Sequence, residues 1–163
     1  MSGHAAHCWL KTPLGELELV SHDGALLAEI HLPGEKQPEG AGGEETVPVL
    51  RLACQQLTEY FSGQRLVFDL PLAPRGTPFQ MKVWQALREI PFGVTVSYRD
   101  IARAVGQPTA CRAVGGANGR NPLPIVVPCH RVIGARGALV GFSGGLDNKV
   151  WLLEHEASVR RRQ

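Results

Sequence analysis

The chain has 163 residues, of which 44% are hydrophobic and 20% are charged. It therefore has the size of one ordinary domain or two small ones, and its composition excludes a disordered protein or a charged repeat. No apolar run approaches the roughly 20 residues that span a bilayer, and the first residues lack the cationic and apolar regions of a signal peptide. The sequence predicts a soluble protein of the cytoplasm.

The net charge of +2 hides an asymmetry between the two halves of the chain. Residues 1–74 carry four Lys or Arg against ten Asp or Glu, whereas residues 75–163 carry thirteen against five. A basic half of this kind is typical of a protein that binds a polyanion. We therefore expect a basic face on the second half. The alternative is that the asymmetry has no functional meaning and that the basic run at residues 160–162 is simply solvated.

The cysteines and histidines give no recognisable metal site. The four cysteines have wide, irregular spacings and include no C-x-x-C pair, and an intracellular chain keeps such residues reduced. A closed structural zinc site needs four ligands, and the histidines around Cys8 match no such pattern. The sequence predicts no metal and no cofactor. The cysteines are Cys8, Cys54, Cys111 and Cys129.

The first half is expected to form a small antiparallel sheet with one helix. Apolar and polar residues alternate on both sides of a polar turn that contains Asp23-Gly24, which is typical of a β-hairpin. Further along, apolar residues at helical spacing precede Gly63, a typical helix end. The expected elements are strands at 17–20 and 26–30, an exposed loop at 33–48, a helix at 49–61, a third strand at 66–70 and a linker at 71–76.

The second half is expected to be helical. Thr77 followed by Pro78 is typical of a helix start, and Ser97 is placed to cap a second helix that ends at Gly106. A tight connection then leads into a third short helix, and two short helices joined in this way match a helix-turn-helix. The expected helices cover residues 77–90, 98–105, 109–117 and 146–157.

The segment 121–132 carries the strongest chemical signal. Its apolar run at 125–127 predicts a buried, extended piece that ends at Pro128, directly before Cys129. The following His130 and its neighbouring arginine favour the thiolate, which is the nucleophilic form of a thiol whose ordinary pKa is about 8.5. From these residues alone, a cysteine that only packs is an equally good interpretation, because neighbouring side chains in extended backbone point apart.

Several motifs of the second half, taken together, resemble the O6-alkylguanine-DNA alkyltransferase family. They occur in the order and spacing of that family over residues 77–157, which is far more specific than a single pentapeptide. The first half resembles the family only weakly. The matching segments are residues 112–118 (RAVGGAN), 121–122 (NP), 128–132 (PCHRV), 142–146 (FSGGL) and 151–156 (WLLEHE).

The resemblance implies DNA repair by a single, irreversible transfer of the alkyl group to Cys129 from O6-alkylguanine, and also from O4-alkylthymine. In the family pattern His130 takes the thiol proton through a water, Glu156 orients His130, and Asn121 braces the turns around the nucleophile. The resemblance further implies contacts to the damaged base, which are assigned to Tyr98, Pro124, Val132, Phe142 and Ser143.

The resemblance also implies that the helix at 109–117 lies in the minor groove of duplex DNA. Small side chains let a helix approach that groove closely, and Arg112 would enter the base stack once the damaged base is flipped out. A helix that merely packs on a neighbour, with solvated arginines, is the alternative interpretation. The implied contacts are Arg112, Ala113, Gly115, Gly116 and Ala117, with Arg99, Arg103 and Arg120 at phosphates.

The fold implied by the resemblance is α+β with two domains. Residues 1–74 would form a ribonuclease H-like domain with a small antiparallel sheet and a helix, and residues 77–163 a helical domain of winged-helix or helix-turn-helix type. The implied partner is double-stranded DNA that contains O6-alkylguanine, and no membrane is involved. The protein is expected to be a monomer in solution, and cooperative binding along DNA stays open.

Two functions of other classes remain as alternatives. One is a binding module that marks alkylated bases without repairing them, but such modules lack the nucleophilic cysteine that Cys129 supplies. The other is a thiol hydrolase that turns over repeatedly, which needs an oxyanion hole that the sequence does not reveal. Repeated turnover of an acyl substrate would favour the hydrolase.

Overall fold

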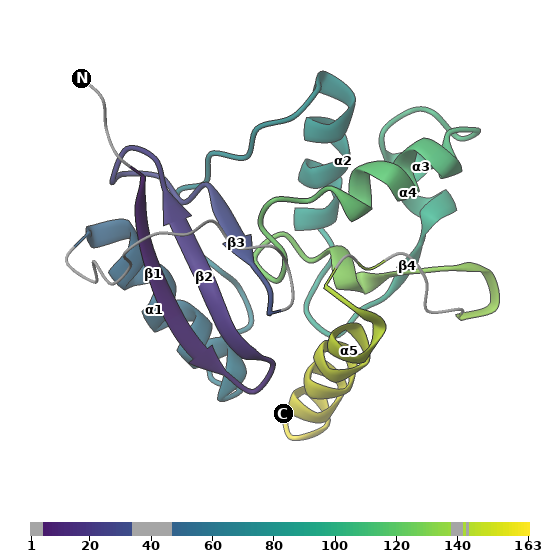
Figure 1. Ribbon diagram of the computed structural model, residues 1–163. Coiled ribbons are helices and arrows are strands. Elements are labelled where there is room, and N and C mark those ends of the chain that lie inside the picture. Colours follow the sequence, from purple (N-terminus) through teal and green to yellow (C-terminus); the bar gives the residue numbers. More distant parts are fainter. Residues whose placement is uncertain (1–4, 34–46, 138–141, 143) are drawn as a thin grey trace. The chain divides into compact units, whose positions relative to one another are not determined.

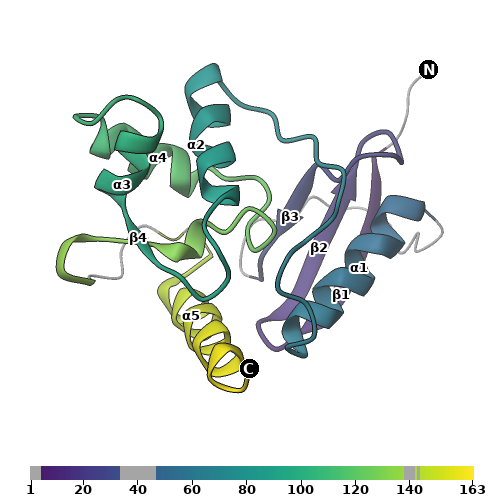
Figure 2. The same cartoon turned by 180° about the vertical axis from the view of Figure 1, so that it is seen from behind.

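The chain folds into two compact units, Met1–Arg75 and Gly76–Gln163. The computed structural model describes residues 5–33, 47–137, 142 and 144–163. Figures 1 and 2 show a sheet with a helix in the first unit and a group of helices in the second. None of the helices in the described part of the chain combines the length and the apolarity that a bilayer span requires.

The first unit contains a three-stranded antiparallel sheet in the order β1-β2-β3. The second and third strands form the hairpin that the sequence predicts, with Glu18 opposite His31. The third strand is shorter than expected, because residues 26–28 lie outside it. The strands are β1 (Ala6–Thr12), β2 (Gly15–Ser21) and β3 (Glu29–His31).

β1 is a strand that the sequence analysis does not predict. It pairs along its whole length with β2, from Ala6 opposite Ser21 to Thr12 opposite Gly15. Only Cys8 among its residues is buried, and the apolar Trp9 interrupts the alternation of apolar and polar residues that marks a half-buried strand. The predicted helix is present as α1 (Pro48–Phe61), which packs against β1 and β2 (Figures 1 and 2).

Residues 66–70 form no strand, so the prediction of a strand there is wrong. Gln56 of α1 holds this segment instead. Its side-chain amide donates to the Asp69 carbonyl and its carbonyl oxygen accepts from the Asp69 N–H, both at 2.9 Å. The pairing that does occur is an isolated bridge between Leu27 and Leu72.

The second unit begins with two helices that are capped as the sequence predicts. The Thr77 hydroxyl accepts from the Gln80 N–H, while the Gln80 side chain accepts from the Thr77 N–H, and Ser97 and Asp100 repeat this arrangement. The last helix runs one turn further than expected because Val159 is still buried. The helices are α2 (Pro78–Arg88), α3 (Tyr98–Ala104), α4 (Cys111–Gly119) and α5 (Leu146–Arg161).

Helices α3 and α4 form the predicted helix-turn-helix and pack against α2. A short parallel ladder between β4 (Val96–Ser97) and β5 (Val132–Ile133) connects the start of α3 to the residues that follow Cys129. Two single-turn 3₁₀ helices, η1 (Cys129–Arg131) and η2 (Ala135–Gly137), flank β5. η1, which begins at Cys129, also contacts the last helix α5. The segment around Cys129 is thus held by both the helix-turn-helix and α5.

Candidate active site

The segment before Cys129 forms a tight buried turn and not the extended piece that the sequence predicts. Ile125 has a φ of 75°, a conformation that β-branched residues rarely adopt. Pro124 and Val127 form a bridge across the turn, and the Val127 N–H donates to the Leu123 carbonyl at 2.8 Å. The apolar run is therefore buried as predicted, but the chain makes a turn within it.

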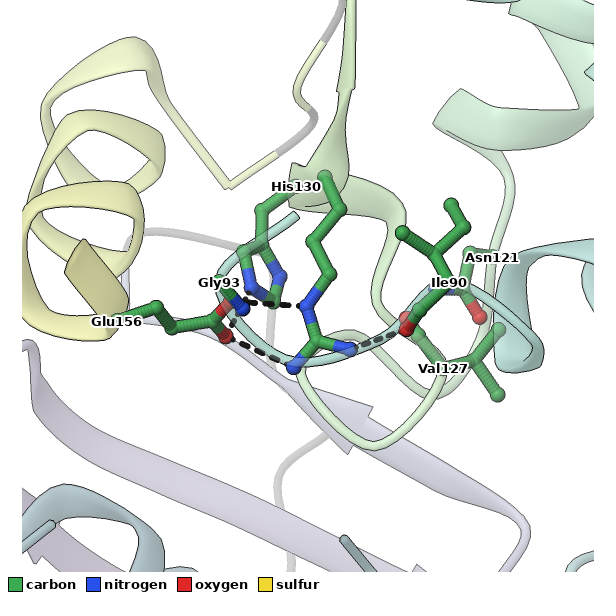
Figure 3. A network of polar contacts seen from close by, with 7 residues as sticks. Ile90, Gly93, Asn121, Val127, His130 and Glu156 are labelled. Carbon is green, nitrogen blue, oxygen red and sulfur yellow. Dashed lines mark hydrogen bonds and ion pairs between the residues drawn. The ribbon is translucent and has the colours of Figure 1, made fainter. Parts of the chain in front are cut away.

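Asn121 holds this turn together. Its side-chain amide donates to the Val127 carbonyl at 2.7 Å (Figure 3). Its side-chain oxygen accepts from the Leu123 N–H at 2.9 Å. Asn121 is buried, so both ends of its amide are satisfied as buried polar groups require. It links the two arms of the turn that leads into Cys129.

Cys129 follows this turn as the first residue of η1 and is only 3% exposed. Its N–H donates to the Val127 carbonyl at 2.8 Å. Its carbonyl accepts from the side-chain amide of Asn118 on α4, at 3.3 Å. The backbone of Cys129 is therefore fixed both by the turn and by the second helix of the helix-turn-helix.

A buried network of charged groups lies next to Cys129 in the chain (Figure 3). His130 Nε2 lies 2.7 Å from Glu156 Oε2, which is on α5. Arg131 grips the same carboxylate with two donors, Nε to Oε1 at 2.8 Å and Nη2 to Oε2 at 2.9 Å. Arg131 also donates through Nη1 to the Ile90 carbonyl at 2.7 Å, and the Gly93 N–H donates to Glu156 Oε1 at 3.0 Å.

The electrostatics of this network keep Glu156 ionised and His130 neutral. Burial by itself raises the pKa of Glu156, but the hydrogen bonds from His130 and Arg131 and the positive charge of Arg131 hold it far below its usual range. Burial lowers the pKa of His130, the positive charges of Arg131 and Lys149 act in the same direction, and Glu156 opposes them. A carboxylate only accepts hydrogen bonds, so His130 Nε2 carries the hydrogen. The buried Nδ1 then presents a lone pair with no partner among the described residues.

Lys149 is a site residue that the sequence analysis misses. It is completely buried on α5, and its Nζ donates to the Val132 carbonyl at 2.6 Å. Burial lowers the pKa of Lys149, and the electrostatic interaction with Cys129 opposes this shift. Its position in the sequence could have indicated a place in the site. Lys149 lies seven residues before Glu156, and two helical turns place both residues on one side of α5.

Tyr98 at the start of α3 also lies within electrostatic reach of Cys129. Burial and the negative charge of Cys129 raise the pKa of Tyr98, and a hydrogen bond from the Asn118 side chain partly offsets them. The Tyr98 hydroxyl therefore stays protonated at neutral pH. The structure thus brings Tyr98, Asn118 and Cys129 together from α3, α4 and η1.

The other residues predicted to contact the base occupy different positions around this centre. Pro124 is buried within the turn. Val132 is completely buried in β5, and its carbonyl binds Lys149. Phe142 is 8% exposed, and its carbonyl accepts a hydrogen bond from Gly145. Ser143 lies outside the described residues.

α4 presents a smooth exposed strip. Arg112, Ala113 and Gly116 are exposed, and Gly115 is half-buried with its Cα near the ring of Tyr98. A Cβ added at Gly116 meets no atom within 4 Å, so packing within the described structure does not require a glycine there. Packing within the described structure therefore does not explain why residue 116 is a glycine.

Ala117, the remaining residue of α4 that is predicted to contact DNA, lies apart from this strip. It is 3% exposed, and its carbonyl accepts from the indole N–H of Trp84 on α2 at 2.9 Å. Its small side chain allows α4 to pack closely on α2. The arginines predicted to contact phosphates are all exposed, namely Arg99, Arg103 and Arg120. Within the described residues no group of three His, Cys, Asp or Glu side chains could hold a metal ion.

Two family models match the chain and together cover most of its length. The model described as "6-O-methylguanine DNA methyltransferase, DNA binding domain" matches residues 78–158. The model described as "6-O-methylguanine DNA methyltransferase, ribonuclease-like domain" matches residues 7–74. The chemical groups described above lie within the first of these ranges.

Relatives and solved structures agree with the family models. The constitutive methylated-DNA–protein-cysteine methyltransferase of Bacillus subtilis is 50% identical over 155 residues, which cover 90% of this chain and 92% of the relative. The corresponding protein of Methanosarcina barkeri is 47% identical over 153 residues, or 93% and 97% of the two chains. The crystal structure of Mycobacterium tuberculosis O6-methylguanine methyltransferase has a TM-score of 0.86 at 42% identity and covers 95% of this chain and 94% of its own. A structure of that protein in complex with DNA has the same TM-score and identity and covers 94% of each chain.

Proposed function

Because this chain belongs to the 6-O-methylguanine DNA methyltransferase family, we propose that it repairs duplex DNA by moving the alkyl group of O6-alkylguanine onto the thiol of Cys129. One observation carries this proposal. The residue next to Cys129 is a buried, neutral histidine whose Nε2 is bound to Glu156 and whose Nδ1 has no partner among the described residues. Such a histidine is prepared to accept one proton from a neighbouring thiol.

The reaction is a nucleophilic displacement at the alkyl carbon. The Cys129 sulfur forms a bond to that carbon while the bond from the carbon to O6 of guanine breaks. The thiol proton passes, through a water, to His130 Nδ1, and the leaving guanine anion takes up a proton from solvent water. His130 then returns its proton to solvent, so the thiol proton is replaced by the alkyl group overall. The ammonium of Lys149, which interacts electrostatically with Cys129, stabilises the thiolate before transfer. Tyr98 stays protonated and donates a hydrogen bond to the departing base.

Glu156 and Arg131 act through His130. The carboxylate fixes the Nε2–H tautomer and stabilises the imidazolium that forms when the proton arrives, as in other His–carboxylate pairs. Arg131 occupies both oxygens of Glu156 and so fixes the orientation of the carboxylate. We propose that Arg131 thereby keeps His130 neutral until the thiol gives up its proton. Asn121 positions the turn on which Cys129 stands.

The helix-turn-helix supplies access to a base that is stacked inside a duplex. We propose that the exposed strip of α4, formed by Arg112, Ala113 and Gly116, lies in the minor groove. Arg112 fills the stack after the alkylated guanine, or O4-alkylthymine, has flipped out toward Cys129. Arg99, Arg103 and Arg120 then contact phosphates without reading the sequence. The complex of the M. tuberculosis relative with DNA supports this proposal.

The chemistry resides in the C-terminal domain, for which we propose residues 77–163, following an N-terminal domain of residues 1–74. The thioether on Cys129 is not reversed, so each molecule acts once. The protein acts as a monomer in solution.

Stoichiometry tests this function. A duplex with one O6-methylguanine, in excess over protein, should lose one lesion per protein molecule and then no more, and a duplex with O4-methylthymine should behave alike but more slowly. Continued loss of lesion beyond one equivalent contradicts the single transfer. Tight binding without any loss of lesion would identify a module that only marks damage.

A further inference from the structure

The first unit holds a pair of thiols that the proposed repair chemistry does not use. Cys8 Sγ on β1 lies 3.2 Å from Cys54 Sγ on α1, although 46 positions separate the two residues in the chain. Neither forms a disulfide in the structure. We propose that Cys8 and Cys54 are a redox modification site, at which an oxidant of the low-molecular-weight disulfide class converts the two thiols into a reversible disulfide.

The geometry favours this bond. A disulfide joins its sulfurs at about 2.05 Å, so the two Sγ atoms need to approach by little more than 1 Å from their 3.2 Å separation. β1 and α1 already pack against each other. The bond therefore links two elements that the fold has brought together, and small side-chain shifts are enough to form it.

The exposure of the two residues sets the order of the reaction. Cys54 is partly exposed, whereas Cys8 is completely buried. The thiolate of Cys54 attacks one sulfur of oxidised glutathione, forms a mixed disulfide and releases one glutathione thiolate, which takes up a proton. Cys8 then loses its proton and attacks the Cys54 sulfur, which releases a second glutathione. Two protein thiols are oxidised and one glutathione disulfide is reduced to two thiols.

The disulfide would act on an edge strand. Among the described residues β1 pairs only with β2, and a covalent link from Cys8 would connect it to α1 as well. The link also closes a long loop and so restricts the unfolded chain. We expect the oxidised protein to melt several degrees above the reduced protein. Cys129, in the second unit, takes no part in this bond.

Intact mass and non-reducing peptide mapping of the full chain, incubated with oxidised glutathione, test the proposal. The expected product is lighter by two hydrogen atoms, contains a peptide that joins Cys8 to Cys54, and reverts with a thiol reductant. Cys8→Ser should leave glutathione attached to Cys54, whereas Cys54→Ser should leave Cys8 unmodified because Cys8 is buried. Cys111→Ser, which removes another partly exposed cysteine, should still form the Cys8–Cys54 link.

Two results would overturn the proposal. One is a wild-type chain that keeps glutathione on Cys54 and yields no Cys8–Cys54 peptide. The other is a link that joins either cysteine to Cys111 or Cys129. Both are read from the wild-type protein, so they do not depend on the folding of a variant, and neither bears on methyl transfer to Cys129.

Discussion

The two units of the molecule bury different kinds of polar groups. Among the described residues, the first unit buries Glu18, Ser21 and Gln56, whereas the second buries Asn118, Asn121, His130, Arg131, Lys149 and Glu156. A buried charge destabilises a fold unless it is well paired, and replacing a buried ion pair by apolar residues often stabilises a protein. The concentration of charge in the second unit is therefore better explained by chemistry than by stability.

A histidine–glutamate pair in each unit makes the contrast specific. In the first unit, His7 Nδ1 lies 3.1 Å from Glu18 Oε2, but Glu18 Oε1 is buried with no partner among the described residues. His7 is 19% exposed, whereas His130 is completely buried. Both histidines have a cysteine next to them in the chain, Cys8 after His7 and Cys129 before His130. Among the described residues, the second-unit pair differs in having Arg131 on its carboxylate. The surroundings of such a pair, and not the pair itself, prepare it for proton transfer.

The largest expected effect is the loss of the nucleophile. Cys129→Ser should abolish methyl transfer from O6-methylguanine, since a serine hydroxyl beside the same histidine is far less nucleophilic. Lesion loss is measured by single-turnover kinetics, and binding of the duplex by fluorescence anisotropy should persist. Cys111→Ser is the matched control and should transfer normally. Comparable transfer by Cys129→Ser would remove Cys129 from its role.

Removing the negative charge of Glu156 should lower both the transfer rate and the stability of the fold. Glu156→Gln leaves the Arg131 guanidinium buried without a counter-charge, so we expect a loss of about 3–5 kcal/mol in the free energy of unfolding. The single-turnover rate should fall about 100-fold or more, because His130 loses the group that stabilises its imidazolium. Glu18→Gln is the matched change in the first unit and should leave the transfer rate within about twofold. Equal rate losses in both variants would refute the contrast between the pairs.

The exposed strip of α4 should matter for duplex DNA and not for the chemistry. We expect Arg112→Ala to lower the transfer rate on duplex O6-methylguanine by about tenfold or more, since unstacking a base costs a few kcal/mol. The reaction with free O6-alkylguanine base should be nearly unchanged, because no base must be flipped. Parallel rate measurements on the two substrates provide the check. An equal loss on both would argue against a role in the stack.

The smallest effect concerns the pH profile. Burial and the charges of Arg131 and Lys149 lower the pKa of His130, so the transfer rate should not decline until the pH falls below 6.5, the ordinary value. Removing the positive charge with Arg131→Met raises the pKa of His130, so more imidazolium forms in mild acid and the decline moves to higher pH. Arg131→Lys should shift the profile less. Rates between about pH 5 and 8 measure this, and an unshifted profile for Arg131→Met would contradict the role of Arg131.

Local signals allowed the sequence to predict some elements and not others. The capped starts of α2 and α3 follow from residues three positions apart, Thr77 with Gln80 and Ser97 with Asp100. β1 escaped prediction because Trp9 interrupts its alternation, whereas its pairing with β2 along the whole strand involves residues that are distant in the chain. Residues 66–70 look like a strand, but they are held by a glutamine of α1.

The candidate site also contains some features that the sequence predicts and others that it does not. Cys129, His130 and Glu156 could be named from the family pattern, and the structure brings the last two to 2.7 Å from one another. The turn at Ile125 could not be foreseen, because its positive φ is opposite to the preference of a β-branched residue. The burial of Lys149 depends on contacts with β5 that are distant in the chain.

The most direct measurement is the intact mass of the protein after incubation with a duplex that contains one O6-methylguanine, followed by peptide mapping. The account predicts that each protein molecule gains one methyl group, that the group lies on Cys129, and that the loss of lesion equals the gain. A methyl group on Cys8, Cys54 or Cys111 in place of Cys129, or loss of the lesion without any gain in protein mass, would contradict it.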